Sequence, residues 1–144
     1  NDQMPNFAYN RLVQVFGDVS NKKVTFLGVS YRGDVGDTRF TPVDALVEMV
    51  RNTGAEIVLH DPFISYWEEQ KCDVRADLAA IVAMNPELII ISAGHSEYKS
   101  PSVILKLLEA EPTNIYDTIG LLSSEQISLL KDKHLVKVLG RGDI

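Results

Sequence analysis

Lys23–Asn52 reads KVTFLGVSYRGDVGDTRFTPVDALVEMVRN and decides the fold of this 144-residue chain. The stretch begins with a short apolar run that stops at Gly28, which predicts a buried strand. It ends with an amphipathic helix, because valines and a leucine recur at helical spacing between positions 43 and 50. Thr41 is the expected N-cap of this helix, and Asp44 lies three residues later, as in a capping box.

The connection between that strand and that helix, Gly28–Thr41, is long and charged. Such connections in α/β units usually have about 2–6 residues. This one is far longer and carries four charged residues, Arg32, Asp34, Asp37 and Arg39. Ligands of open α/β sheets bind beyond the carboxyl ends of the strands, where helix N-termini present free amides. The loop is therefore the first candidate for a ligand site.

Length and composition indicate one globular domain. A chain of 144 residues with 45% hydrophobic residues can bury a core without metal or disulfide support. The net charge of −6 argues against nucleic acid or an anionic membrane as the main partner. Cys72 is the only cysteine, so neither a disulfide nor a cysteine metal site is expected, and a cytoplasmic setting fits. No apolar run approaches the ~20 residues of a membrane span, and no signal peptide is visible.

Predicted strands and helices alternate along the rest of the chain. Strands are expected at Glu56–His60, Asp73–Arg75, Leu88–Ile91, Asn114–Asp117 and Leu135–Leu139. Helices are expected from Pro5 to Phe16, over Phe63–Gln70, after Asp77, from Ser100-Pro101, and after a capping box of Ser123 and Gln126. This order implies right-handed crossovers.

We therefore expect a Rossmann-like, doubly wound α/β domain whose mostly parallel sheet has five to six strands, with helices on both faces. The switch point should lie between Lys23–Leu27, near the centre of the sheet, and Leu88–Ile91. The loops Gly28–Thr41 and Ala93–Tyr98 would then face one crevice, with the turn Asp117–Leu122 at the same edge.

Two alternatives stay open for the loop side chains. Arg32 and Arg39 can each hold a phosphate or a carboxylate. Arg39 could equally pair with Asp37 or Asp34 and stiffen the loop. Tyr31 could stack on a base or sugar, or it could fill the interface between sheet and helix. Neither the Gly-x-Gly-x-x-Gly nor the Walker phosphate motif is present in the loop.

The remaining chemically capable residues form no complete catalytic set. His95 and Glu97 could do acid-base work, although such a pair more often caps the following helix. His60 and His134 lie at or beside strands and are expected to be structural. Cys72 lies in a charged segment without a nearby base, so a nucleophilic role is not expected.

Two motifs carry a resemblance to a known family. Gly28–Pro42 reads GVSYRGDVGDTRFTP and Gly54–Pro62 reads GAEIVLHDP. Together they resemble the C-terminal domain of the UDP-glucose/GDP-mannose dehydrogenases, which typically has an aromatic-Lys pair, Asp-x-Arg, Ser-Pro, Gly-Ala and Asp-Pro. The opening Asn1–Pro5 resembles the end of the long central helix of the same enzymes, so the resemblance extends to about Asp117.

The resemblance implies an NAD-dependent enzyme in which an N-terminal domain binds NAD and carries the catalytic cysteine. It oxidises a UDP-sugar C6 alcohol to the uronic acid in two hydride transfers, through a thiohemiacetal and a thioester. Residues 1–17 would end a connector and dimerisation helix, and residues 18–144 would form the nucleotide-sugar-binding domain. Expected partners are the UDP-sugar, the NAD-binding domain of the same chain, and further copies in a homodimer or higher homo-oligomer. No catalytic residue is expected in this fragment, which should be inactive alone.

By the same resemblance, Tyr31 and Arg32 contact the nucleotide sugar and Arg39 reaches NAD across the interdomain cleft. Four positions depart from the family pattern. Arg32 replaces the commoner Lys, Phe40-Thr41 replaces Glu-Ser, and Ile119 stands where a basic residue is usual.

The strand-helix pattern also bears on two other functions. A stand-alone nucleotide-binding or regulatory module without catalysis is the alternative to the dehydrogenase domain. A phosphoacceptor receiver domain shares the strand-helix pattern but needs an aspartate after a central strand and a lysine after the last one. Ile91-Ser92-Ala93 and Gly140-Arg141-Gly142 offer neither.

Overall fold

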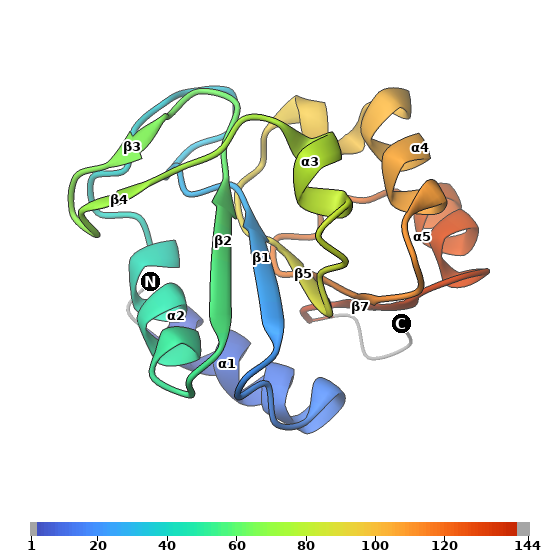
Figure 1. Cartoon of the computed structure of the whole chain (residues 1–144), viewed down its shortest axis with the longest axis horizontal. Coiled ribbons are helices and arrows are strands. Elements are labelled where there is room, and N and C mark those ends of the chain that lie inside the picture. The colour runs from blue at the N-terminus through green and yellow to red at the C-terminus, as the bar shows by residue number, and fades with distance from the viewer. Residues whose placement is uncertain (1–2, 141–144) are drawn as a thin grey trace.

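A computed structural model describes residues 3–140. The first two residues of the predicted connector helix (1–17) and the last four of the predicted binding domain (18–144) lie outside this range. Arg141 and Gly142, which follow the last strand, are among them. Five strands form one parallel sheet in the order β2-β1-β5-β6-β7 (Figure 1). They are β1 Lys23–Leu27, β2 Glu56–His60, β5 Leu88–Ile91, β6 Asn114–Asp117 and β7 Leu135–Val138. The predicted parallel α/β sheet is confirmed.

Helices cover both faces of this sheet. One face carries α1 Met4–Phe16 and α2 Val43–Arg51, and the other carries α3 Leu78–Val82, α4 Pro101–Glu109 and α5 Ser124–Lys131. The central strand β5 is apolar on both sides, so each face of the sheet needs a layer of helices to cover it. Leu88 and Ile90 enter one core cluster, and Ile89 and Ile91 enter the other. A strand buried on both faces is typical of such parallel sheets. The doubly wound arrangement is thus confirmed.

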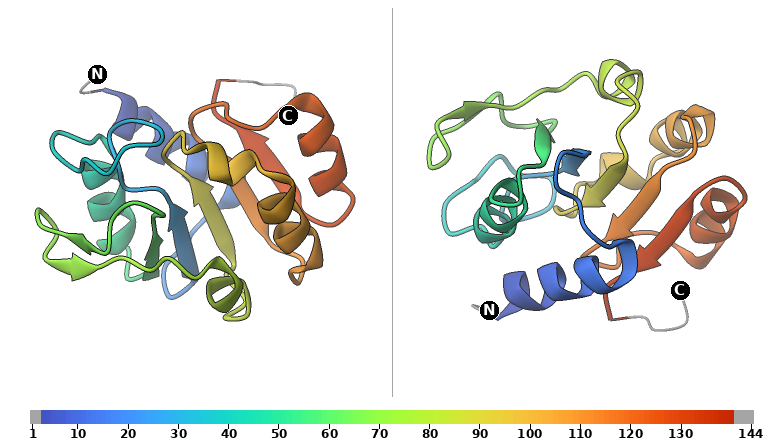
Figure 2. Two further views of the ribbon diagram at one scale, coloured as in Figure 1. Left: turned by 90° about the horizontal axis from the view of Figure 1, so that it is seen from above. Right: turned by 60° about the horizontal axis from the view of Figure 1, so that its bottom comes forward.

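Helix α1 packs into the same core as the strands. Ala8 and Leu12 are fully buried in one cluster with Val24 and Phe26 of β1. The Tyr116 hydroxyl of β6 donates a hydrogen bond to the Ala8 carbonyl over 2.9 Å. Figure 2 shows α1 crossing beneath the strands in the right-hand view. The apolar side of α1 is therefore buried against the sheet of this domain.

The predicted helix starts are confirmed at three sites and wrong at one. Asp77, Ser100 and Ser123 each accept a hydrogen bond from a backbone N–H of the first turn, and Ser123 forms the full capping box with Gln126. At α2 the N-cap is Pro42 and not the predicted Thr41, although the Thr41 hydroxyl accepts from the Val43 N–H over 3.3 Å. Asp44 makes no capping box there, because it is the second helical residue after this N-cap and not the third; its carboxylate accepts a hydrogen bond from Gln70.

The helix predicted over Phe63–Gln70 is wrong. This segment contains β3 Tyr66–Trp67, which pairs antiparallel with β4 Cys72–Asp73. Trp67 is fully buried and Tyr66 is 44% exposed, so adjacent side chains point to opposite sides, as in a strand. Burying the indole in the core favours this conformation over helical propensity. The predicted edge strand at Asp73–Arg75 is present in part, since Arg75 bridges to His60 at the end of β2.

Candidate functional site

The loops that follow β1 and β5 meet at the switch point of the sheet. These neighbouring parallel strands send their chains to opposite faces (Figure 2, left). The Asp34 N–H donates to His95 Nδ1 over 2.8 Å, and Ser96 donates to the Asp34 carboxylate through its N–H and its hydroxyl. The predicted switch point is confirmed, but the two loops contact each other directly instead of facing a common crevice.

Two glycines allow this close approach. A Cβ at Gly28 would lie 2.3 Å from the Ala93 Cβ, and Gly28 has φ +102°, which disfavours other residues. A Cβ at Gly33 would lie 2.3 Å from the Gly94 carbonyl oxygen. The loops therefore touch directly at these two positions.

Tyr31 and Arg32 lie on the solvent-exposed surface of the loop after β1. Tyr31 is 55% exposed, so it does not fill the core, and Arg32 is also exposed. The Tyr31 N–H donates to the Asp37 carbonyl over 2.7 Å, which closes the loop on itself. An aromatic ring and a guanidinium are thus adjacent in sequence, accessible, and attached to the carboxyl end of β1.

A hollow of about 420 Å³ adjoins Tyr31. Phe40, Pro42 and Pro5 also line it, which brings the start of α1 beside the start of α2. Phe40 is 94% exposed and has φ +58°, a conformation that is uncommon for a bulky residue. Strained residues of this kind cluster at functional sites, although the strain alone assigns no role.

Arg39 pairs with Asp37 and not with Asp34. Its Nε and Nη2 donate to the two carboxylate oxygens of Asp37 over 3.0 and 3.1 Å. The hydrogen bond from the Arg39 side chain lowers the pKa of Asp37 to about 2, helped by the Arg39 N–H. The Arg39 side chain is nevertheless 75% exposed. The predicted pair with Asp37 is therefore present, and the guanidinium still faces solvent.

A buried hydrogen bond between His95 and Asp61 underlies the two loops. His95 Nε2 lies 2.9 Å from Asp61 Oδ2, and both side chains are fully buried. Asp61 also accepts from the N–H groups of Val29 and Phe63 and from the Ser30 hydroxyl. Burial by itself would raise the pKa of Asp61, but these hydrogen bonds, led by that of His95, outweigh it and lower the pKa.

His95 and Glu97 do not act as the predicted helix cap. The cap of α4 is Ser100, which accepts from the Val103 N–H over 3.3 Å, and Glu97 is exposed. Sequence reasoning also missed Asp61 as a partner of His95. The available signal was its place directly after a buried strand and before a proline.

The other candidate residues are structural or inert. His60 contacts the Tyr98 hydroxyl and the Ala76 carbonyl, and His134 contacts the Leu107 carbonyl and the Thr113 N–H. Burial raises the pKa of the Cys72 thiol, which opposes nucleophilic activity.

Ile119 lies at the same sheet edge as the two loops. It belongs to a turn in which the Asp117 carboxylate accepts from the Ile119 and Leu122 N–H groups. Its Cδ1 would be 3.7 Å from a Cβ built on Gly94, and 40% of Ile119 is exposed.

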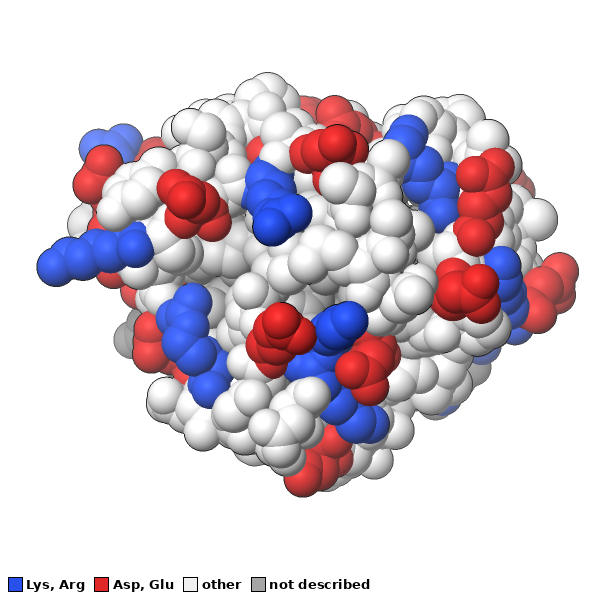
Figure 3. All heavy atoms as spheres, in the orientation of Figure 1, with Lys and Arg blue, Asp and Glu red and all other residues white. Residues whose placement is uncertain are grey.

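In the described part of the chain, neither the surface charge nor the grouping of side chains points to another kind of site. Basic and acidic side chains are interspersed on the face seen in Figure 3, with no extended region of one sign. Within residues 3–140, no three histidine, cysteine or acidic side chains are grouped to hold a metal ion, and no helix is long and apolar enough to cross a membrane.

Comparison with known proteins identifies similar sequences. The family described as "UDP-glucose/GDP-mannose dehydrogenase family, UDP binding domain" matches residues 25–124. UDP-N-acetyl-D-mannosamine dehydrogenase of Methanococcus aeolicus is 28% identical over 102 residues, which are 69% of this chain and 22% of the relative. UDP-glucose 6-dehydrogenase 4 of Arabidopsis thaliana is 41% identical over 71 residues, which are 49% of this chain and 14% of the relative.

A solved structure shares the fold. It is an NDP-N-acetyl-D-galactosaminuronic acid dehydrogenase from Methanosarcina mazei Go1, and it matches with a TM-score of 0.78 at 25% identity. The match covers 98% of this chain and 30% of that protein. The chain thus spans less than a third of the length of each of these three proteins.

Proposed function

This chain belongs to the UDP-glucose/GDP-mannose dehydrogenase family through its UDP binding domain, and from that premise we propose that it is the nucleotide-sugar-binding C-terminal part of an NAD-dependent UDP-sugar 6-dehydrogenase. The observation that carries the proposal is the loop Gly28–Thr41, which leaves β1 at the switch point and exposes Tyr31, Arg32 and Arg39. Ligands of such sheets bind at this edge.

We assign contact with the nucleotide sugar to Tyr31 and Arg32. The guanidinium of Arg32 can donate two parallel hydrogen bonds to a phosphate. The exposed ring of Tyr31 offers a face for stacking on a base or sugar. Both side chains are already exposed to solvent, which supports the assignment.

We assign contact with NAD to Arg39. Within residues 3–140, its bonds to Asp37 use Nε and Nη2, so Nη1 is available to an anionic phosphate. This donor set fits a pyrophosphate group presented by a second domain. Bound NAD would supply the hydride acceptor, and the role of Arg39 would be to hold the cofactor at the domain boundary.

The longer enzyme that we propose oxidises the C6 alcohol of a UDP-sugar to a carboxylate, with one NAD reduced at each of two steps. Its partners would be the UDP-sugar, the NAD-binding domain of the same chain and further copies of the chain, in the cytoplasm. The relatives act on UDP-N-acetyl-D-mannosamine and UDP-glucose according to their names. We propose UDP as the shared recognition element, and Ile119 as a residue that alters the sugar side of the pocket.

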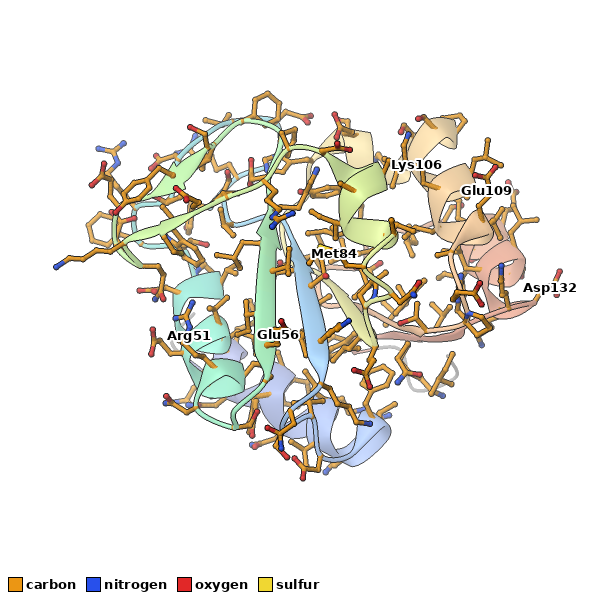
Figure 4. All side chains as sticks on the ribbon, viewed as in Figure 1. Arg51, Glu56, Met84, Lys106, Glu109 and Asp132 are labelled. Atoms are coloured by element: carbon orange, nitrogen blue, oxygen red, sulfur yellow. The ribbon has the colours of Figure 1, made fainter. Side chains whose placement is uncertain are left out.

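The test is titration of the chain with UDP by isothermal calorimetry. We expect saturable binding that weakens about tenfold or more in Arg32→Ala, since hydrogen bonds to charged groups contribute more than neutral ones. Arg51→Ala is the matched control. Figure 4 shows Arg51 at the end of α2 that is distant from the carboxyl ends of β1 and β2, where it pairs with Glu48 and donates to the Gln70 side chain. Equal affinity of both variants and the unmodified chain would contradict the assignment of Arg32.

A further inference from the structure

We propose that His95 is a positioning residue that fixes the conformation of the Tyr31-Arg32 turn. The proposal rests on the function proposed above, in which this turn contacts the nucleotide. The His95 side chain is fully buried and cannot contact a ligand directly, so any effect on binding must pass through the groups to which it is hydrogen-bonded. Those groups are the Asp34 N–H in the loop Gly28–Thr41 and the carboxylate of Asp61, which directly follows β2.

The hydrogen bonds of His95 specify one tautomer. A backbone N–H can only donate, so the 2.8 Å contact from the Asp34 N–H requires a lone pair on Nδ1. The proton of the neutral ring then lies on Nε2, which donates to Asp61 Oδ2 over 2.9 Å. The rings of Phe63 and Tyr98 lie against His95, with centroids at 5.0 and 5.6 Å, and restrict its orientation.

Asp61 and His95 together hold both ends of the turn. Asp61 accepts from the Val29 N–H and the Ser30 hydroxyl, immediately before Tyr31. His95 accepts from the Asp34 N–H, immediately after Gly33. Tyr31, Arg32 and Gly33 therefore span two fixed points.

The consequence is preorganisation of exposed side chains. Asp34 has φ +61°, a conformation that needs support from its surroundings. The bond to His95 and the bonds from Ser96 supply that support. A loop that is already ordered loses less conformational entropy when it binds a ligand, so weakening the His95 bond to Asp34 should lower affinity without removing any ligand contact.

Two substitutions separate the two bonds of the ring. In His95→Asn, the amide oxygen can occupy the Nδ1 position and accept from Asp34, while the donor to Asp61 is lost. In His95→Gln, the amide nitrogen can occupy the Nε2 position and donate to Asp61, while the acceptor for Asp34 is displaced. We expect His95→Gln to weaken UDP binding about three- to tenfold, the range of one hydrogen bond, and His95→Asn to weaken it less.

His134→Gln is the matched control. His134 is a buried histidine whose Nδ1 accepts from the Thr113 N–H and whose Nε2 lies 2.7 Å from the Leu107 carbonyl. It precedes β7 and so lies at the opposite, amino edge of the sheet. We expect this variant to melt at a lower temperature and to keep its UDP affinity.

The measurements are calorimetric titration with UDP and NMR of the 144-residue chain. The ¹⁵N shifts of the His95 ring should report the Nε2–H tautomer, and the amide signals of Arg32, Gly33 and Asp34 should move in His95→Gln but not in His134→Gln. Unmoved amides together with unchanged UDP affinity in His95→Gln would overturn the positioning role, as would equal losses of affinity in all three variants. Failure of the unmodified chain to bind UDP would overturn the proposed function instead, and the tautomer and amide signals would still decide whether His95 holds the turn.

Discussion

Arg39 combines an ion pair with exposure. Two of its donors bind Asp37 in the same loop, and the side chain stays 75% exposed. The hydrogen bond from this arginine lowers the pKa of Asp37 to about 2, so the pair keeps its charges well below neutral pH. A paired but exposed guanidinium has little conformational freedom left to lose when it contacts a phosphate.

Arg39→Ala should therefore weaken cofactor use in an enzyme that carries this domain. We expect the KM for NAD to rise about tenfold or more, since a hydrogen bond to a charged group is lost. The KM for the UDP-sugar should change much less. Steady-state kinetics with each substrate varied in turn would check this, and unchanged NAD kinetics would show that Arg39 has no such role.

At the scale of single elements, local signals determined most boundaries. The α5 helix is an example, because Ser123 accepts from the Gln126 N–H over 3.1 Å and the Gln126 side chain accepts from the Ser123 N–H over 3.0 Å. Both partners lie three residues apart, so no tertiary contact is needed to form the box.

Ser123→Ala should lower the free energy of unfolding by ~1 kcal/mol, because an N-cap hydrogen bond is lost. Thermal denaturation should show a decrease in Tm of roughly 3 °C for a domain of this size. Ser128→Ala is the control, since Ser128 is exposed in the middle of the same helix and alanine has the higher helix propensity. An equal loss of stability in both variants would contradict the role of the cap.

The segment from Phe63 to Asp73 shows the opposite case. Its apolar residues fit a helical spacing, yet β3 and β4 form a hairpin there. Trp67 is buried in the core cluster that also contains Val47 and Val50 of α2. The position of that cluster depends on helices and strands distant in sequence, so the local pattern alone predicted the wrong element.

Across the whole molecule, burial couples stability to pH. Burial is the main reason why the pKa values of His60 and His134 are lowered. An unfolded histidine has a pKa near ~6.5. Below that pH the unfolded chain takes up protons that the folded chain does not, so the stability from these two groups is present above ~6.5 and is lost as the pH falls.

The free energy of unfolding should thus decrease between pH 7 and 5, by up to ~1.4 kcal/mol per pH unit for each of the two rings. Urea denaturation at several pH values would measure the slope. His134→Gln should reduce the slope by removing one titrating group. Carboxylates with lowered pKa values, such as Asp61, lose their contribution below about pH 4 and do not affect this window. A stability that is constant or rises on acidification from pH 7 to 5 would refute the argument.

The sequence by itself determined the layers of this protein. Apolar periodicity identified the five strands of the parallel sheet and most helices. The spacing of apolar residues along the chain depends on whether an element buries one face or both faces. The alternation of strands and helices, with its crossover rules, placed the switch point between β1 and β5 and therefore placed Gly28–Thr41 at the ligand edge.

Only the tertiary structure decided which side chains pair. It selected Asp37 over Asp34 for Arg39, joined His95 to Asp61, and buried Trp67 in a hairpin instead of a helix. His95 and Asp61 are 34 positions apart in sequence, and no periodicity records such a contact. It exists because parallel strands bring the ends of β2 and β5 to one edge, where a buried carboxylate must find hydrogen-bond donors.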